Sequence, residues 1–484
     1  MRPILAGTDT EYGLLIEGRD AKTQVEDSQA FVESYTATCG FDFITGWDYR
    51  YENPRNDLRG FQLKNLAIDP NDAKFDQGKQ YASSIELRAD RILANGARLY
   101  NDHGHPEYAT PESFSIFELA RLDQQGELIM EKLSQTFNTP NSLYKNNTDY
   151  HGASYGTHES YSIPRSYSAE AIQNAVLPML IVRQILTGAG KVGHESGDPT
   201  HYQLSQRADF FVEITNAETL WRRPIFNTRD EPHADPANWI RLHVISGDAN
   251  MNPFCTALRI GLVKLAIHLL EADLAPTWKI KNPVQTFKSI ARDFQFKFTI
   301  ELEKSWTNAY EIFESYFAAA QHLQLNDEMG WVIHQSRSLL QSLNQDWNSF
   351  RKRVDWATKL HVLDQVRESE NVDWNDPLLQ SCDLEYSNIN RDEGLFFALS
   401  QEVDPSLPPS ISSSHPRSFA RAIAIEKWSN HIQAVGWRGI TFKTPQNPNQ
   451  FVELYPDLAY PETLKEISDV ETFIQVLQSL RPID

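Results

Sequence analysis

Residues 95–112, "NGARLYNDHGHPEYATPE", place polar and ionisable side chains two positions apart. Side chains at positions i and i+2 of a β-strand point to the same face, so a strand here would put Arg98, Tyr100 and Asp102 on one face. An apolar core does not accept such charges unless they have partners, and a surface loop has no need for the spacing. The pattern therefore predicts a strand that carries chemistry on one face.

A second stretch of this kind lies near the N-terminus, where "GTDTEYG" sets Asp9 and Glu11 two positions apart. If both strands lie in one sheet, three carboxylates meet a guanidinium, and Glu107 follows after the "HGHP" turn. Such carboxylates repel one another unless a hard cation neutralises them, and Mg²⁺ prefers oxygen ligands and commonly keeps substrate phosphates. Arg98 would then face a phosphate rather than a carboxylate. Asp9 or Glu11 alone is typical of a solvated strand; together the two segments predict a site.

Three further stretches carry candidate residues without deciding their roles. A lone histidine is more often structural than a ligand, and an arginine beside acidic residues commonly forms a structural ion pair. The chain has no Walker-type glycine loop and no GxGxxG motif at the start of a helix, so a nucleotide would have to be held by a sheet surface. The candidates are Asn146, Asn147, His158 and Glu159 in residues 144–161, Arg229 in residues 226–235, and Arg241 and His243 in residues 241–250.

Composition narrows the class of protein. A chain of 484 residues can bury a large core and is long enough for two or three domains, or for one large domain with an appendage. Its net charge of −20 argues against nucleic acid as the main ligand, because binding phosphates needs clustered Lys and Arg. No run approaches the roughly 20 apolar residues that span a bilayer. Three widely spaced cysteines, Cys39, Cys255 and Cys382, fit neither a disulfide framework nor a zinc site, which favours a reducing cytoplasm.

The order of strand-like and helix-like segments predicts an α+β fold. Residues 2–16 and 208–215 are typical of strands, and residues 171–186 of a helix that ends at Gly188. Residues 404–416, "DPSLPPSISSSHP", are typical of a linker. Beyond it, the sequence predicts a small α/β unit with a helix over 419–435, a strand over 439–443 and a helix over 470–480.

The polar segment 50–82 lies between two structured segments. Loops of this length are usually disordered or functional, and composition alone favours disorder slightly.

Ten motifs in order resemble one known family over nearly the whole chain. They include "GTDTEYG", "GWDYRYENPRNDLRGF", "NGARLYNDHGHPEYATPE", "LYKNNTDYHGASYGTHESY", "NTRDEPHAD" and "RLHVISGDAN". The chain resembles the ligase and depupylase family of the prokaryotic ubiquitin-like protein Pup, within the carboxylate–amine ligase superfamily. The resemblance implies a glutamine-synthetase-like curved antiparallel sheet packed with helices over residues 1–405, and a small C-terminal α/β domain over residues 415–484.

The resemblance also implies roles for single residues. Asp102 matches the catalytic aspartate. Depupylases usually read "GTEVEYG", so Asp9 keeps the usual carboxylate but is shorter by a methylene. The metal-binding candidates are Asp9, Glu11, Tyr100, Glu107 and His158, for Mg²⁺; the nucleotide-binding candidates are Arg98, Thr110, Arg229, Arg241 and Trp437, for ATP.

Two features favour the depupylase branch of the family. The chain reads "DHGHPEY" where ligases read "DVGSHPEY", and it carries the long segment 50–82 where depupylases have a mobile loop. The implied activity is an ATP- and Mg²⁺-dependent amidase and isopeptidase, which deamidates the C-terminal Gln of Pup or a Pup-like modifier and releases the modifier from substrate lysines. No nucleic-acid or membrane partner is expected.

Two alternatives to this activity stay open: a Pup ligase that acts through a γ-glutamyl phosphate, and a non-catalytic Pup-binding homologue. Whether Asp102 attacks the carbonyl itself or activates water or phosphate is also open.

Overall fold

A seven-stranded antiparallel sheet forms the centre of the computed structural model, which describes residues 1–67, 88–195, 199–410, 414–445 and 447–481. The strand order is β15–β10–β1–β8–β7–β6–β3, so the N-terminal strand lies inside the sheet, next to the central strand β8. An antiparallel sheet packed with helices confirms the predicted α+β class. The strands are β1 (Ala6–Glu11), β3 (Phe43–Ile44), β6 (Arg91–Leu93), β7 (Arg98–Asp102), β8 (His105–Ala109), β10 (Thr157–Pro164) and β15 (Trp239–Val244).

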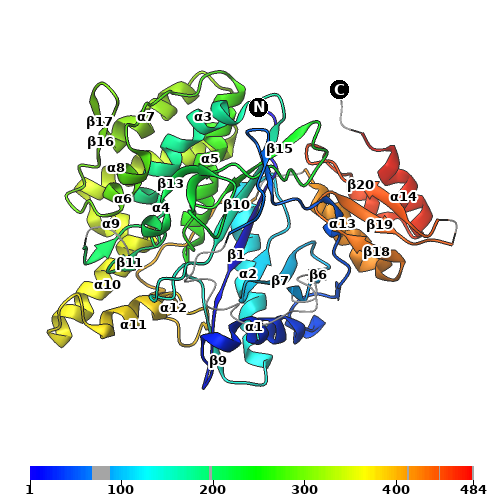
Figure 1. Ribbon diagram of the computed structural model, residues 1–484, viewed down its shortest axis with the longest axis horizontal. Helices are drawn as coiled ribbons and strands as arrows, with labels where there is room; N and C mark the ends of the chain where they lie inside the picture. The colour runs from blue at the N-terminus through cyan, green and yellow to red at the C-terminus, as the bar shows by residue number, and fades with distance from the viewer. Residues whose placement is uncertain (68–87, 196–198, 411–413, 446, 482–484) are drawn as a thin grey trace.

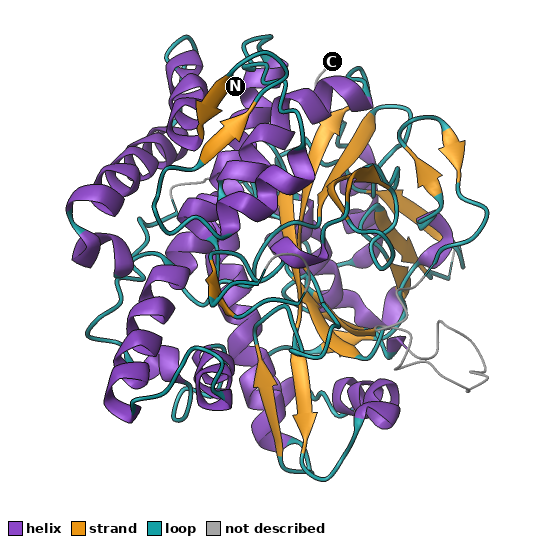
Figure 2. Cartoon of the chain, turned by 60° about the vertical axis from the view of Figure 1, so that its left-hand side comes forward, coloured by secondary structure: helices purple, strands orange, loops and turns teal. Residues whose placement is uncertain are grey.

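Helices cover one face of this sheet. Along β10, Tyr161 and Ile163 are buried in the large apolar core, whereas Ser160 and Ser162 between them are only partly buried. Figure 1 shows this helical layer on one side of the sheet and the C-terminal elements on the other side of the view, and in the turned view of Figure 2 most of the helices lie to the left of the strands. The period of two along the strands therefore separates an apolar back face from a polar front face.

Local capping sets where the central helices of this layer begin. The hydroxyls of Ser115 and Ser168 accept the backbone N–H groups of Glu118 and Ala171, and Asn252 caps the helix that begins with Pro253. These helices are α2 (Ile116–Thr136), α3 (Ala169–Val182) and α5 (Pro253–Glu271). The other helices of this layer are α4 (Gln184–Thr187), α6 (Pro283–Ala291), α7 (Ala309–Ala320), α8 (Asp327–Gln345), α9 (Trp347–Arg351), α10 (Asp355–Glu370), α11 (Pro377–Tyr386) and α12 (Leu395–Ala398).

Helix α5 shows that the expectation of no long apolar run was wrong. Within the described ranges it is the one helix long and apolar enough to cross a membrane, although no such run was expected from the sequence. Its apolar stretch is wholly buried inside the protein, where it contacts α2, α3 and α8. It is apolar on all sides because it lies at the centre of the helical layer.

Several predicted elements have different bounds in the structure. The N-terminal strand is divided into β1 and β2 (Gly13–Ile16), and β2 pairs with β9 (Asn141–Tyr144) instead of continuing the main sheet. Residues 208–210 form a 3₁₀ turn, and only Glu213–Asn216 (β13) are extended, paired with β14 (Pro224–Asn227). The helix predicted to end at Gly188 continues past α3 as α4 and does end there. A Cβ on Gly188 would lie 2.1 Å from the Leu204 carbonyl oxygen, so only glycine fits.

The first part of segment 50–82 is ordered, contrary to expectation. Residues 56–62 form a hairpin of β4 (Asn56–Asp57) and β5 (Phe61–Gln62). The Leu58 N–H donates to the Thr228 carbonyl (2.8 Å), and the Thr228 hydroxyl donates to the Asp57 carboxylate (2.7 Å). These hydrogen bonds to Thr228, the residue after β14, order this part, and composition could not reveal them. Residues 68–82 lie outside the described residues.

The C-terminal elements form a smaller sheet with its own apolar core. They are α13 (Arg417–Trp428), β18 (Ile432–Val435), β19 (Gly439–Phe442), β20 (Gln450–Glu453) and α14 (Val470–Ser479). The helix predicted over 419–435 ends at Trp428, because Ile432 and Val435 belong to a strand that pairs with β19. The core of this unit also takes in Trp47 and Ile92 from the main part. The division at residues 405 and 415 stays a prediction.

Buried ion pairs fasten this unit to the main sheet. The Glu112 carboxylate, just after β8, accepts hydrogen bonds from Arg417 (2.8 Å) and Arg421 of α13. Burial opposes ionisation of Glu112, but the two guanidiniums outweigh it and lower the pKa of Glu112 below its ordinary value.

We predict that Glu112→Gln lowers the free energy of unfolding by about 3 kcal/mol, because it leaves two buried guanidiniums without a counter-charge. Urea unfolding measures this change. The matched control is Glu301→Gln, since Glu301 pairs with Lys281 at the surface; we expect it to change stability by less than about 0.5 kcal/mol. Equal losses in both variants would contradict a tethering role for Glu112.

Candidate active site

Strand register brings the sequence-predicted residues onto the front face of the sheet. Asp9 of β1 lies opposite His158 of β10 on one side and Ala109 of β8 on the other. Glu11 lies opposite Glu107, and Glu107 lies opposite Tyr100 of β7. Directly opposed residues of antiparallel strands present their side chains on the same face. The prediction that the two polar strands share one sheet is therefore confirmed, with β8 between them.

Three carboxylates meet on this face. One oxygen each from Glu11, Asp102 and Glu107 lies within 4.8 Å of the others. The Tyr100 hydroxyl donates to Glu107 (2.5 Å), and Glu11 accepts the Gly156 N–H (2.7 Å). Burial, and then the charge of Asp102, raises the pKa of Glu11 to about 8. Burial and the neighbouring carboxylates raise the pKa of Glu107 well above its ordinary value. Glu11 and Glu107 therefore hold protons more tightly than ordinary glutamates.

Asp102 differs from its two neighbours. Burial acts to raise its pKa, but the charge of Arg88, whose guanidinium lies 3.1 Å from Asp102 Oδ1, and then that of His103 lower it below its ordinary value. The side chain keeps 23% of its surface exposed and lines a cavity of about 710 Å³. Asp102 is thus an ionised, accessible carboxylate, as a general base or nucleophile must be. Arg88 belongs to no motif, and sequence reasoning missed it.

A second cluster lies beside the first and contains two imidazoles. Asp9, His158 and His243 each bring one ligand atom to within 4.8 Å of the others. Burial, and then the positive charges of Arg207 and Arg241 respectively, lowers the pKa of His158 and of His243 well below the ordinary value, so both rings are neutral. Burial raises the pKa of Asp9 to about 6. The sequence marked His243 as a candidate residue without a role, and it was not among the predicted metal ligands.

Arginines line the same cavity. Arg241 donates to the Glu231 carboxylate (3.1 Å) and to the Ser160 hydroxyl (3.3 Å), and Arg229 donates to the Ala217 carbonyl (3.3 Å) and to the Thr219 hydroxyl (3.2 Å). The sequence left open whether Arg241 forms a structural ion pair, and the structure shows that it does, with Glu231. Both guanidiniums border the cavity from the side of β14 and β15.

Arg98 lines the cavity as well, but it is already paired. Its guanidinium lies 2.7 Å from the Asp90 carboxylate and 4.0 Å from the centroids of the Trp47 and Tyr100 rings. Arg98 thus faces the carboxylate of Asp90, eight residues earlier, which no motif marks. Its predicted contact with a nucleotide phosphate stays a prediction.

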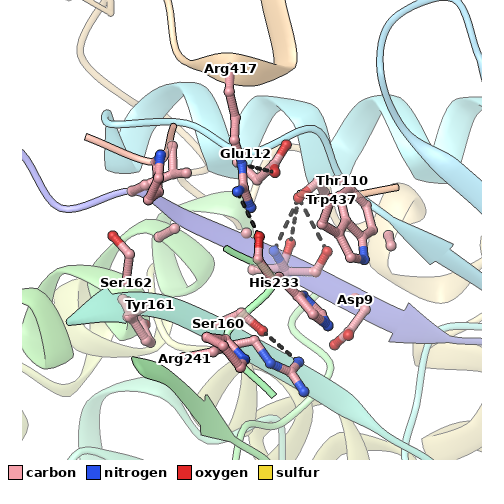
Figure 3. A pocket seen from close by; sticks show the side chains of 17 residues that line it. Asp9, Thr110, Glu112, Ser160, Tyr161, Ser162, His233, Arg241, Arg417 and Trp437 are labelled. Atoms are coloured by element: carbon pink, nitrogen blue, oxygen red, sulfur yellow. Dashed lines mark hydrogen bonds and ion pairs between the residues drawn. The ribbon is translucent and has the colours of Figure 1, made fainter. Parts of the chain in front are cut away.

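An adjoining cavity of about 560 Å³ is bordered by aromatic rings (Figure 3). The rings of His233 and Trp437 lie at its edge, nearly parallel and 6.2 Å apart. The Thr110 hydroxyl also lines it and donates to the Thr8 carbonyl (3.1 Å). The two cavities share five residues, Asp9, Ala109, His233, Arg241 and Trp437. A ligand with a flat ring at one end and several negative charges at the other fits this continuous space.

Three candidates from residues 144–161 lie elsewhere. Glu159 points to the back face, where it pairs with Arg183 (2.9 Å) and Arg259 (3.5 Å). The side-chain amides of Asn146 and Asn147 donate to backbone carbonyls of their own loop. A period of two explains the difference, because His158 and Glu159 are neighbours in one strand and must face opposite sides.

Comparison with known proteins agrees with this geometry. The family described as "Pup-ligase protein" matches residues 4–441. The chain belongs to this family. It is 33% identical over 464 residues to a protein named "Depupylase" from Acidothermus cellulolyticus, covering 91% of each chain. It is 37% identical over 330 residues to a "Pup--protein ligase" from Renibacterium salmoninarum, covering 64% of this chain and 70% of the relative.

Two solved structures share the fold. The Pup ligase PafA in complex with Pup superimposes with a TM-score of 0.75 at 25% identity, covering 98% of this chain and 92% of the other. PafA in complex with ADP superimposes with a TM-score of 0.70 at 27% identity, covering 86% and 95%. These similarities confirm the fold expected from the resemblance. The roles of the individual site residues stay predictions.

We predict that Glu11 gives the metal-free protein a distinctive pH dependence. Its pKa is about 8 when folded and close to the ordinary 4.5 when unfolded, so the folded state binds the proton more tightly. Stability from this group is therefore fully present below pH 4.5 and is lost as the pH rises to about 8. Thermal melting in EDTA measures it, and Glu11→Gln should flatten the decline. Parallel declines in both proteins would contradict the assignment.

Proposed function

We propose that the chain is an ATP- and Mg²⁺-dependent Pup deamidase and depupylase. It converts the C-terminal Gln of Pup or a Pup-like modifier to Glu, and it hydrolyses the isopeptide bond between the modifier and a substrate lysine. The observation that carries this proposal is Asp102, an ionised and accessible carboxylate beside two buried ones. The relative named "Depupylase", matched over 91% of both chains, supports the hydrolytic direction.

The side chains of the site fit a nucleotide with its metal ion. Glu11 and Glu107 offer oxygen ligands of the kind that Mg²⁺ prefers, and burial, followed by the neighbouring carboxylates, raises the pKa of each. Arg229 and Arg241 would hold phosphates, and a base would lie at Trp437. The ADP complex of PafA supports this use of the cavities. When bound, the metal ion would supply positive charge that polarises the reacting carbonyl.

The chain's own residues account for the rest of the reaction. Arg88 keeps Asp102 ionised and fixes the direction of its carboxylate. Asp102 then either takes a proton from the attacking water or attacks the side-chain carbonyl carbon itself. Arg229 and Arg241 lie across the same cavity, where they stabilise negative charge that develops on the carbonyl oxygen. The proton that Asp102 takes from water goes to the departing nitrogen, which leaves as ammonia from the Gln amide or as the lysine amine from the isopeptide. Where Asp102 attacks instead, water protonates the departing nitrogen and then hydrolyses the resulting anhydride, which restores the carboxylate.

The ligase direction is the second candidate, because the two solved structures described above are of a Pup ligase. It would use nearly the same residues. The named ligase relative matches only 64% of this chain, and "DHGHPEY" has the depupylase spelling. The other discriminating feature, the long loop, extends into residues 68–82, which lie outside the described residues.

The partner follows from the same proposal. Pup, which is bound to PafA in the first of the two solved structures, is the modifier that best fits this family, and its lysine conjugates would be the second substrate. We place the enzyme in the cytoplasm: all three cysteines, each within the described part, are free.

We predict that the purified protein, with ATP and Mg²⁺, converts a modifier that ends in Gln to the Glu form. Intact mass spectrometry follows this change, and a preformed lysine conjugate should be cleaved in the same buffer. Attachment of a Glu-ended modifier to a lysine substrate would instead establish the ligase. Binding of the modifier without any mass change would establish a non-catalytic homologue.

We predict that Asp102→Asn lowers the rate of both hydrolytic reactions by at least about 100-fold, because the amide keeps the shape of the side chain but neither accepts a proton nor attacks. Nucleotide binding, measured by calorimetry, should stay within about threefold of wild type. The control is Asp230→Asn, which breaks the pair of Asp230 with Arg165 away from the described carboxylate cluster and should leave turnover unchanged. Wild-type turnover in Asp102→Asn would remove Asp102 from the mechanism.

A further inference from the structure

A third cavity, of about 980 Å³, lies between the start of the chain, the beginnings of α2 and α8, and the inner helix α5. It shares no lining residue with the two cavities of the candidate active site. Its walls include the buried apolar side chains of Ile4, Phe117 and Met329. Two ionisable side chains of α5, Lys264 and His268, also line it, and their spacing of four residues places them on one face of the helix. The reaction proposed above uses neither of them.

Lys264 differs from the other lysines that are buried in the described part of the chain. Lys145 and Lys359 each lie 2.7 Å from an aspartate oxygen, and Lys191 lies 2.9 Å from a glutamate oxygen. The Nζ atom of Lys264 donates one hydrogen bond, to the Phe114 carbonyl (2.8 Å), and no described carboxylate forms an ion pair with it. Because an ammonium group has three N–H donors and needs a counter-charge when buried, this environment suits a neutral amine.

The charges around Lys264 agree with this assignment. Burial lowers the pKa of Lys264 to about 8; the charge of Glu328 opposes this shift, and that of Arg2 adds to it. Glu328 lines the cavity, but it accepts hydrogen bonds from the Ser115 hydroxyl and the Ile116 N–H (3.1 Å). About half of the Lys264 side chains are therefore neutral at pH 8, compared with less than about 1% for an ordinary lysine. The neutral amine is the form that attacks a carbonyl carbon.

His268 provides a second, independent observation. Its side chain lines the same cavity and is 6% exposed, and it makes no hydrogen bond to any described residue. Burial, and then the charge of Lys264, lowers the pKa of His268 to about 3, so the ring is neutral and has one N–H donor and one acceptor nitrogen. A buried imidazole without a partner costs free energy. A ligand oxygen next to Lys264 would satisfy it.

We propose that this cavity is a second reactive site of the protein, in which the Lys264 amine binds a small uncharged aldehyde as an imine. The Nζ atom forms a bond to the carbonyl carbon, and one of its protons passes to the carbonyl oxygen. The resulting hydroxyl, hydrogen-bonded to His268, then leaves with the second Nζ proton as water, and the nitrogen electron pair forms the C=N bond. The apolar walls and the carboxylate of Glu328 favour an uncharged aldehyde over an anionic one. The proposal does not depend on the reaction at the front face of the sheet.

Site-resolved labelling of the unaltered protein tests the proposal. The full-length chain is incubated at pH 8 with propanal and cyanoborohydride, which reduces an imine to a stable secondary amine, and peptide mass spectrometry locates the labels at low conversion. We expect Lys264 to be labelled at least about tenfold faster than Lys281, a surface lysine whose side chain is 52% exposed, because more of its amine is neutral. Lys359, which is buried but paired with Asp383, is the matched control and should stay unlabelled. Labelling of Lys264 no faster than that of Lys281 would overturn the proposal.

A second aldehyde shows whether the cavity selects its ligand. Glyoxylate has the same reactive group as propanal but carries a negative charge. We expect the ratio of propanal label to glyoxylate label to be higher at Lys264 than at Lys281, because only Lys264 lies among apolar walls beside a carboxylate. Equal ratios at the two lysines would show a reactive amine without a binding site, and would overturn the proposal.

The pH profile of labelling gives a third readout. The charged residues that line the cavity with Lys264 are Arg2, Asp327 and Glu328, and His268 stays neutral. The rate of labelling at Lys264 should therefore level off above about pH 8, where most of its amine is neutral. A rate that keeps rising to about pH 10, as for an ordinary lysine, would show that Lys264 is a protonated structural residue and would overturn the proposal.

Discussion

The buried Glu11 and Glu107 and the more exposed Asp102 each bring an oxygen to within 4.8 Å of the others. Two ionised carboxylates at that separation repel by roughly 3 kcal/mol at an effective dielectric constant of about 20. Protons relieve this repulsion in the protein alone, as the raised pKa of Glu11 and of Glu107 indicates. A bound cation would relieve the repulsion by neutralising the carboxylates directly. The same cluster that lowers the stability of the protein at neutral pH therefore creates affinity for a metal ion.

Asp102 escapes protonation because Arg88 provides a counter-charge from outside the sheet. The site therefore separates two functions among similar groups: buried carboxylates available to a metal, and one ionised carboxylate available to a substrate. The arginines across the cavity and the aromatic edge at Trp437 extend the site away from the carboxylates. The ion pairs of Glu112 hold the C-terminal unit that carries Trp437, so the tether also maintains the shape of the cavity.

The period-two pattern in β1 and β7 predicted which of their side chains share one sheet face, because alternation depends only on neighbouring residues. Thr110 and Trp437 became candidates only through the family resemblance. The partners Asp90 and Arg88 could not be predicted, since each acts through a contact that no local pattern encodes. The same limit explains the hairpin at residues 56–62, which is ordered by bonds to Thr228, and Ile432–Val435, which join a strand instead of extending α13. The position of His243 could not be predicted from the sequence either, because only strand register places it beside Asp9 and His158.

Anomalous diffraction from crystals soaked with Mn²⁺ and a non-hydrolysable ATP analogue tests the central claim most directly, since it locates metal and phosphates together on the sheet face. The account predicts a manganese peak between Glu11 and Glu107, phosphates against Arg229 and Arg241, and Asp102 next to the terminal phosphate with its carboxylate still paired to Arg88. Nucleotide and metal bound away from this face, with the carboxylate cluster unchanged, would contradict it.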